Sequence, residues 1–439
     1  MKDKKKKNYL VWGIALLLLL ALSAFSYAVF IRSPNIPPTD TEEPVATFTI
    51  GDEEVVLSDD KENSTADHVR RGNTVVTGQG TIPELRKISQ KSTAGAVFVS
   101  APSAEENTVR YMERATGHVY DIKFDSWTAL RVSNTTIPKI YNSVWSKDGI
   151  SALLQYEKEN SDIIETYFVE LSAQTKLSED DYEEESAEPE FQLEGKNTTT
   201  NISYISPESY AREVSYLTRM NGETTMAISK FDGSGERIVW SSPLKEFVLH
   251  WPNEYNAVIT TKPSYSAPGY SYLISTSNKN RERLMGGIYG LTVLPNKDVS
   301  LLLYSESLNP GLLFGLFDPA QGIVKNVSLK TLPEKCVWSR NSSSIAYCAV
   351  PIALPNANYP DDWYKGRVSF QDQIWKIDDE EGSVQLISEL DKLTGERIDA
   401  VSLQLSVNNS RMIFTNKTNG SLWMLKIKEN SIVEEYEEE

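Results

Sequence analysis

The sequence predicts an all-β fold, a seven-bladed β-propeller preceded by one N-terminal transmembrane helix, and three observations lead to it. A unit of apolar strand, polar turn and apolar strand recurs along the chain. The turns that begin at positions 206, 252, 295 and 339 are 46, 43 and 44 residues apart, and one four-stranded blade takes roughly 40 to 50 residues. From Leu85 to Ile427 we find no long run with a helical period.

The clearest copy of the unit runs from Cys336 to Cys348. An apolar run ends at Trp338, turn-forming residues follow at 339–344, and an apolar strand pattern resumes at 345–347. The Ser or Pro that opens each turn is found at Ser89, Ser146, Ser206, Pro252, Pro295, Ser339 and Ser406. Seven units predict seven blades, and because the first unit is the weakest, six blades remain an alternative.

The N-terminal segment has the pattern of a signal anchor. Residues 1–8 form a basic tail with five lysines, and residues 9–31 are 23 apolar or small residues without a charge, long enough to span a bilayer as a helix of about 20 residues. The lysines predict a cytoplasmic N-terminus and an extracytoplasmic body at the cell membrane. A cleaved signal peptide is the alternative, because small residues near Ala24 and Ala28 offer cleavage sites.

The rest of the chain divides into three parts by composition. Residues 32–84 are rich in Pro, Thr, Asp, Glu and Ser and predict a stalk or linker. Residues 85–430 carry the propeller, and residues 431–439 form an acidic tail. The last repeat has too little chain for a fourth strand, so we expect a strand from the N-terminal side to close the ring, with candidates at 46–50, 54–57 and 73–77.

Charge excludes one class of partner. The formal net charge is −17, and the N-terminal basic tail contributes +4, which leaves −21 for the remainder. A body with this charge would repel nucleic acid. It would also resist docking on an anionic lipid surface, and the predicted contact with the membrane is made through residues 9–31.

The repeat also resembles a known family. The turn Trp145-Ser146-Lys147-Asp148-Gly149, with apolar strands at 150–154 and 167–171, resembles the TolB-like (WD-repeat-like) propeller repeat. The likeness covers about 340 residues as architecture but only a few residues in each blade, and the separate N-terminal domain of TolB is missing, so its role does not carry over. Residues 336–364 also resemble uncharacterised membrane-anchored propellers of small bacteria, which implies a setting without an activity.

One insertion is the predicted binding site. Residues 351–370 interrupt the sixth repeat between its second and third strands, and loops at this position gather on one face of a propeller. Aromatic and Arg side chains are frequent interface anchors. The candidate partner-binding residues are Tyr359, Asp361, Asp362, Trp363, Tyr364, Arg367 and Phe370. In the alternative interpretation the rings pack the loop onto its own blade.

Sequence motifs for catalysis, cofactors or metals are not found, so none of these sites is predicted. The three histidines, His68, His118 and His250, are dispersed, and no Gly-x-Ser-x-Gly or Gly-rich phosphate loop occurs. We therefore expect a protein-binding scaffold of the cell envelope. The alternative is a glycan-binding or hydrolytic propeller that uses the central funnel, where polar groups from several blades would converge without a linear motif.

The two cysteines are a candidate disulfide. Cys336 and Cys348 are equidistant from Ser342, so in a regular hairpin they would stand opposite each other. An oxidising compartment would permit the bond. Two buried free thiols remain the alternative.

Overall fold

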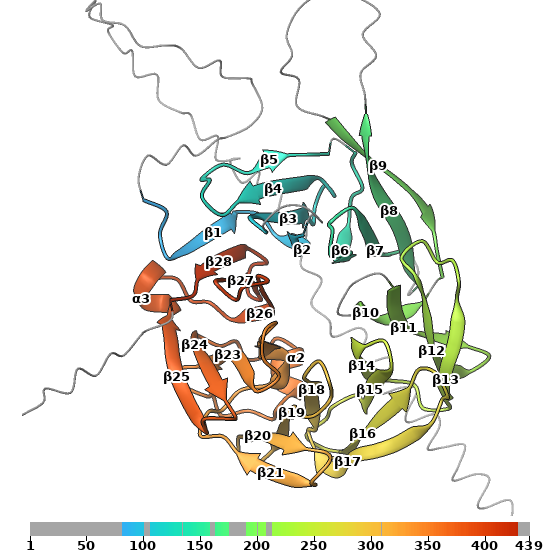
Figure 1. The fold of residues 1–439 in the computed structure, drawn as a ribbon, viewed down its shortest axis with the longest axis vertical. Coiled ribbons are helices and arrows are strands. Elements are labelled where there is room, and N and C mark those ends of the chain that lie inside the picture. The colour runs from blue at the N-terminus through green and yellow to red at the C-terminus, as the bar shows by residue number, and fades with distance from the viewer. Residues whose placement is uncertain are drawn as a thin grey trace, which may run out of the picture. The chain divides into compact units, whose positions relative to one another are not determined.

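The computed structural model describes residues 81–100, 106–133, 135–158, 163–174, 190–199, 201–207, 213–308 and 310–428. These residues form seven antiparallel four-stranded sheets, which follow one another around a central axis (Figure 1). The predicted seven-bladed propeller is confirmed, and the six-bladed alternative is wrong.

Blades 1 to 4 each use four consecutive strands, with the first strand innermost and the fourth outermost. Blade 1 contains β2 (Thr93–Val99), β3 (Thr108–Glu113), β4 (Val119–Lys123) and β5 (Leu130–Arg131), and blade 2 contains β6 (Ile140–Trp145), β7 (Ser151–Glu157), β8 (Ile164–Gln174) and β9 (Glu190–Asn197). Blade 3 contains β10 (Ile202–Pro207), β11 (Glu213–Met220), β12 (Glu223–Lys230) and β13 (Arg237–Ser242), and blade 4 contains β14 (Phe247–Asn253), β15 (Asn256–Thr261), β16 (Pro268–Ser275) and β17 (Arg281–Tyr289).

Blades 5 and 6 keep this order, and blade 7 borrows a strand from the other end of the described chain. Blade 5 contains β18 (Thr292–Pro295), β19 (Leu302–Ser307), β20 (Leu312–Asp318) and β21 (Ile323–Asn326), and blade 6 contains β22 (Cys336–Trp338), β23 (Ile345–Pro351), β24 (Asp372–Asp378) and β25 (Ser383–Glu389). Blade 7 contains β26 (Ala400–Leu405), β27 (Arg411–Asn416), β28 (Leu422–Lys426) and β1 (Leu85–Ser89). Three short helices, η1 (Pro333–Lys335), α2 (Asp361–Tyr364) and α3 (Leu390–Thr394), lie in connections.

The hydrophobic cores lie between successive sheets. One cluster joins Leu217 and Met226 of blade 3 to Leu249 and Trp251 of blade 4, and all four side chains are buried. Residues in the middle strands are buried almost continuously, as in β15, because both faces of each sheet contact a neighbouring blade. The apolar runs in the sequence therefore correspond to middle strands.

The ring is closed by β1, which pairs antiparallel with β28 and places Leu85 opposite Leu425. The interpretation of the turn at Ser89 as the first turn of blade 1 is therefore wrong, since the innermost strand of that blade is β2. An apolar strand ending in Ser has the same pattern at the inner and outer edges of a blade, so the pattern could not separate the two.

Several predicted features lie outside the described residues. These are the basic tail 1–8, the transmembrane segment 9–31, the stalk up to residue 80 with its three candidate closing segments, and the acidic tail 431–439. Within the described part of the chain, none of the helices has the length and apolar character needed to cross a bilayer.

The strand order fixes which loops share a face. In an antiparallel blade, the connection between the second and third strands emerges on the same side as the linker to the next blade. We call this side the linker face. The turns after the first and third strands lie on the opposite face.

Candidate interaction surface

The predicted binding loop joins β23 to β24 on the linker face and carries α2. Its rings are mostly inside the protein: Tyr359 is 1% exposed, Trp363 4% and Phe370 1%. The rings of Trp363 and Phe370 stack with centroids 6.0 Å apart. The prediction that these three residues are surface anchors is therefore wrong, and the alternative, in which the rings pack the loop onto the propeller, describes them.

A buried lysine explains why the rings lie inside. Nζ of Lys335 lies beneath Trp363 and Phe370, 5.4 Å and 5.2 Å from the ring centroids. It forms ion pairs with Asp372 at 2.8 Å and Asp399 at 2.6 Å, and all three charged side chains are fully buried. The aromatic rings thus cover an ion cluster and exclude water from it.

The two carboxylates of this cluster respond differently to burial. Burial raises the pKa of Asp372 to about 6, although the charge of Lys335 opposes the rise. Burial also acts to raise the pKa of Asp399, but the charge of Lys335 and its hydrogen bond, helped by the Phe370 N–H and the Trp363 indole, bring it below the usual value. The indole Nε1–H donates to Oδ2 of Asp399 at 3.1 Å, so Asp399 fixes both the lysine and the loop.

The other predicted residues remain at the surface of the loop. Asp362 accepts the main-chain N–H of Asn358 and pairs with the exposed Arg367 at 3.0 Å, and the Asn358 hydrogen bond is the main cause that lowers its pKa. Oδ2 of Asp361 accepts the main-chain N–H of Tyr265, in the corresponding loop of blade 4, at 2.7 Å. The loop is therefore held across two blades.

A second pair of contacts joins blade 5 and a linker to the same place. The N–H of Gly290 donates to the carbonyl of Ser264 at 2.7 Å, and the hydroxyl of Ser307 donates to the carbonyl of Tyr359. Four segments, at 264–265, 289–290, 307–308 and 359–361, thus meet on the linker face. We call this meeting point the four-segment junction.

Large apolar residues in the connections of the linker face are exposed to solvent. Each of these residues is between 37% and 48% exposed: Tyr265, Tyr289, Leu308, Ile352 and Tyr364. We call these five residues the linker-face patch. Of the five, only Tyr364 is among the predicted residues. Ile352 lies in the same predicted insertion but is not one of its aromatic or charged residues, and Tyr265, Tyr289 and Leu308 each stand alone in a separate connection, with nothing in the sequence to show that these connections meet.

Polar groups also converge on the axial side of the loop. Tyr204 of β10, His250 of β14 and Thr292 of β18 lie on innermost strands, and the hydroxyl of Tyr364 donates to Glu334 in η1. The rings of Tyr204 and His250 are 6.5 Å apart. We call these five residues the axial cluster.

The axial cluster contains unsatisfied polar atoms. Oε2 of Glu334 and Nε2 of His250 are buried without a hydrogen-bond partner among the described residues. Burial raises the pKa of Glu334, against the Tyr364 hydrogen bond. Burial lowers the pKa of His250 to about 4, against a hydrogen bond with the main chain of Val293. His250 is therefore neutral at pH 7. Among the described residues, no group of His, Cys, Asp and Glu side chains is arranged to hold a metal ion.

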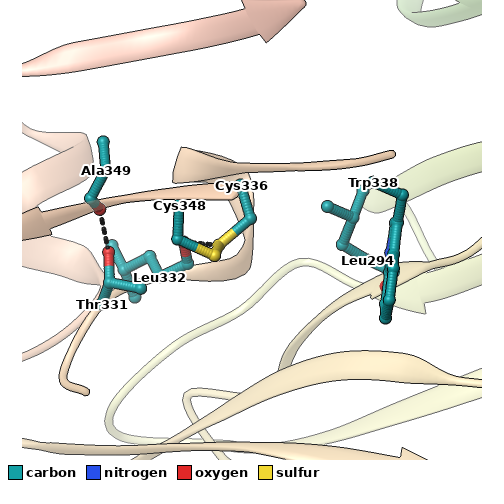
Figure 2. Close-up of a disulfide and its surroundings, with 7 residues drawn as sticks. All are labelled: Leu294, Thr331, Leu332, Cys336, Trp338, Cys348 and Ala349. Atoms are coloured by element: carbon teal, nitrogen blue, oxygen red, sulfur yellow. Dashed lines mark hydrogen bonds between the residues drawn. A yellow bond between two sulfur atoms is a disulfide. The ribbon is translucent and has the colours of Figure 1, made fainter. Parts of the chain in front are cut away.

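The two cysteines of blade 6 are bonded to each other in the structure (Figure 2). Cys336 and Cys348 are direct partners in the β22–β23 register, and their Cα atoms are 4.0 Å apart. Figure 2 also shows the Thr331 hydroxyl, which donates to the carbonyl of Ala349 at 2.6 Å, and the indole of Trp338, which donates to the carbonyl of Leu294 at 3.1 Å. The bond thus lies where β22 is attached to blade 5.

Comparisons with known proteins support the fold alone. No family model matches the sequence, and no curated protein matches it. An oligogalacturonate lyase in complex with manganese is similar in structure with a TM-score of 0.51 and 8% identity over 81% of this chain and 96% of that one. The oligogalacturonate lyase of Vibrio parahaemolyticus has a TM-score of 0.50 and 9% identity over 79% and 94%.

A TolB structure is also among the similar folds. TolB from Acinetobacter baumannii has a TM-score of 0.40 and 11% identity over 75% of this chain and 65% of that one. At identities this low the likeness is one of architecture. The seven sheets of the structure make the chain a seven-bladed β-propeller.

Proposed function

We propose that the protein is a membrane-anchored, extracytoplasmic scaffold that binds a protein partner of the cell envelope through the linker face. The proposal takes its membrane setting from the apolar segment 9–31 and the lysines before it. It takes its binding surface from one observation, the linker-face patch, of which Tyr265, Tyr289 and Leu308 lie in the four-segment junction.

The patch has the features of a protein interface. It combines aromatic side chains with aliphatic ones, and aromatic residues are enriched at the centres of interfaces. Hydrogen bonds between the loops fix them before a partner binds. Asp361 accepts the main-chain N–H of Tyr265, and the N–H of Gly290 donates to the carbonyl of Ser264. A preformed surface loses less conformational entropy on binding. The buried rings of the 352–371 loop support the surface from below.

Crosslinking followed by affinity capture from intact cells tests this proposal. The wild-type chain should recover a specific partner, and the variant Tyr265→Ser with Tyr289→Ser should lose most of it, because both side chains are exposed on the patch. The matched control is Tyr255→Ser, which alters an exposed tyrosine of the same blade on the opposite face. Equal recovery by the double variant and the wild type would refute the assignment of this face.

The axial cluster favours a second candidate function, glycan binding or hydrolysis in the central funnel. Its support is the buried and unpartnered Oε2 of Glu334, near the hydroxyls of Tyr364 and Thr292. Glycoside hydrolysis ordinarily needs two carboxyl groups flanking the bond, whereas Glu334 is the one carboxyl of the cluster. A glycan array and a panel of glycoside substrates, each with wild type and Glu334→Gln, would separate this candidate from the scaffold.

A further inference from the structure

A cavity lies at the seam where blade 7 meets blade 1. Its volume is about 290 Å³, and its walls come from residues 81–86, the β4–β5 turn and the ends of β27 and β28. Three basic side chains line it: Arg86, Arg411 and Lys426. The rest of the protein is strongly acidic, so this concentration of positive charge is local.

Arg86 is held in place without being neutralised. Its side chain is buried, and its guanidinium donates to the main-chain carbonyls of Lys123 at 2.9 Å and Phe124 at 3.0 Å and to that of Ser126. Carbonyl groups orient a guanidinium but carry no net charge. The contrast is Arg110 of blade 1, which is buried to a similar extent and is paired with both oxygens of Asp121 at 2.7 Å and 2.6 Å.

Arg411 adds a second positive charge to the same wall. Its guanidinium lies over the ring of Phe124, 5.6 Å from the centroid, and one nitrogen donates to the carbonyl of Ser410 at 3.0 Å. Burial, followed by the charge of Arg411, lowers the pKa of Arg86, and Asp125 opposes this only in part. Arginine stays protonated at any physiological pH, so both charges persist side by side.

The carboxylates nearby do not neutralise the cavity. Two carboxylates line it, Glu84 and Asp125. Glu84 forms an ion pair with Lys428, and Asp125 acts on Arg86 from a distance. Within the described ranges, no carboxylate comes within ion-pair distance of Arg86, Arg411 or Lys426. The buried Arg86 beside the partly buried Arg411, with no carboxylate paired to either, is unfavourable in the empty protein, and an oxyanion in the cavity would reduce that cost.

We propose that the seam cavity binds a small organic oxyanion, a phosphate or carboxylate whose charged head meets Arg411 and Lys426 and whose apolar part contacts Phe124 and Met424. Arg411 has guanidinium donors left over after its bond to Ser410, and both apolar side chains line the cavity. The site is on the face opposite the linker-face patch, so it is independent of the proposed protein interface.

Calorimetric titration of the detergent-solubilised full chain at low ionic strength tests the inference. The probes are phenyl phosphate, benzoate and inorganic phosphate, which separate the two anion chemistries and the contribution of the apolar part. We expect saturable one-to-one binding of an aromatic probe, tighter than inorganic phosphate, and at least tenfold weaker binding to Arg411→Gln. The matched control Arg219→Gln, which removes an exposed charge of blade 3, should bind like the wild type.

Two further variants complete the binding test. Lys426→Gln, an exposed position, should also weaken binding, which covers the case in which Arg411→Gln fails to fold. Deletion of residues 429–439, which are rich in Glu, should leave the affinity unchanged. The inference is overturned if no probe binds the wild type saturably, if Arg411→Gln and Lys426→Gln both bind as tightly as the wild type, or if binding is seen only after that deletion.

Discussion

Nζ of Lys335 lies 2.6 Å from Oδ1 of Asp399, and neither side chain is exposed to solvent. The pair joins η1, which precedes blade 6, to the linker that leads into blade 7. Through the Trp363 indole, which also donates to Asp399, the same pair holds the 352–371 loop in place. Removing the lysine should therefore disturb the linker face as well as the core.

We expect Lys335→Met to destabilise the protein by about 3 to 5 kcal/mol, because Asp372 and Asp399 would remain buried without their counter-charge. Urea unfolding followed by tryptophan fluorescence would measure the change. The control is Lys262→Met, which removes one partner of an exposed ion pair and should change stability by less than about 1 kcal/mol. Similar values for the two variants would contradict the role assigned to Lys335.

His250 should make the folded state sensitive to acid. Its pKa is about 4 in the folded protein and 6.5 in the reference state, so below pH 6.5 the unfolded chain binds the extra proton and the folded one does not. The contribution of His250 to stability is therefore complete above pH 6.5 and falls by roughly 3 kcal/mol as the pH decreases to about 4.

This pH effect is measured as the free energy of unfolding between pH 7 and pH 4. In His250→Gln the loss over this window should be smaller than in the wild type by most of that amount. His118→Gln is the matched control at a more exposed site and should remove less of the pH dependence. An unchanged pH profile in His250→Gln would show that His250 takes up its proton in the folded state.

Gly290 should tolerate no side chain. Its φ is +65°, and an added Cβ would lie 2.9 Å from Cβ of Ser307 and 3.0 Å from the carbonyl oxygen of Tyr359. We expect Gly290→Ala to cost about 2 to 4 kcal/mol, from left-handed backbone strain together with the clash. Gly322→Ala is the control, since its φ is +67° with open space around it, and strain alone should cost about 1 to 2 kcal/mol. Thermal unfolding would compare the stabilities of the two variants. Equal losses of stability would mean that the four-segment junction rearranges to accept a Cβ at residue 290 at little cost.

Loss of the Cys336–Cys348 bond should weaken the propeller without unfolding it. The cysteines are 12 residues apart in sequence, and closing so short a loop stabilises by about 3 kcal/mol at most in the chain-entropy model. Cys336→Ala with Cys348→Ala should therefore lower the unfolding temperature by several degrees, and reductant should have no further effect on this variant. Mass spectrometry of unreduced peptides checks the bond, and alkylatable thiols at both positions in protein from its native compartment would refute it.

The proposed topology predicts the outcome of proteolysis on spheroplasts. Because five lysines precede the apolar segment 9–31, protease added outside should digest or release the propeller and leave an N-terminal epitope tag intact. An intact cytoplasmic marker protein controls for lysis. A protected propeller in unlysed spheroplasts would place the body on the cytoplasmic side and overturn the proposed localisation.

The spacing of the turns predicted the propeller because each blade is built from residues that are close together in the sequence. Six of the seven predicted turns, all except that at Ser89, lie between the first and second strands of a blade, where the spacing of apolar and turn residues within about 15 positions is sufficient. Whether the aromatic rings of the 352–371 loop are buried or exposed depends on residues that are distant in the sequence. Aromatic residues occur both in interfaces and in cores, and these rings are buried because they cover Lys335, which Asp372 and Asp399 hold beneath them.

The same limit explains what was missed on the linker face. Tyr265, Tyr289 and Leu308 belong to three connections in two blades, and their proximity follows from hydrogen bonds at Ser264, Gly290 and Ser307 that no sequence period encodes. Lys335 was overlooked for the opposite reason. A single lysine after Pro-Glu has the pattern of a solvated turn until its two partners are brought to it.

The pairing of β1 with β28 sets an order of events during biogenesis. Leu85 meets Leu425, so the contact spans most of the chain, and closing so large a loop is slow. While the ribosome has yet to supply residues 422–426, β1 has no partner and blade 7 is incomplete. The ring must therefore seal last, and until it does the unpaired strand edges are exposed to other chains. A chaperone or translocation factor that shields these edges would act in the interval between synthesis of the first blade and that of the seventh.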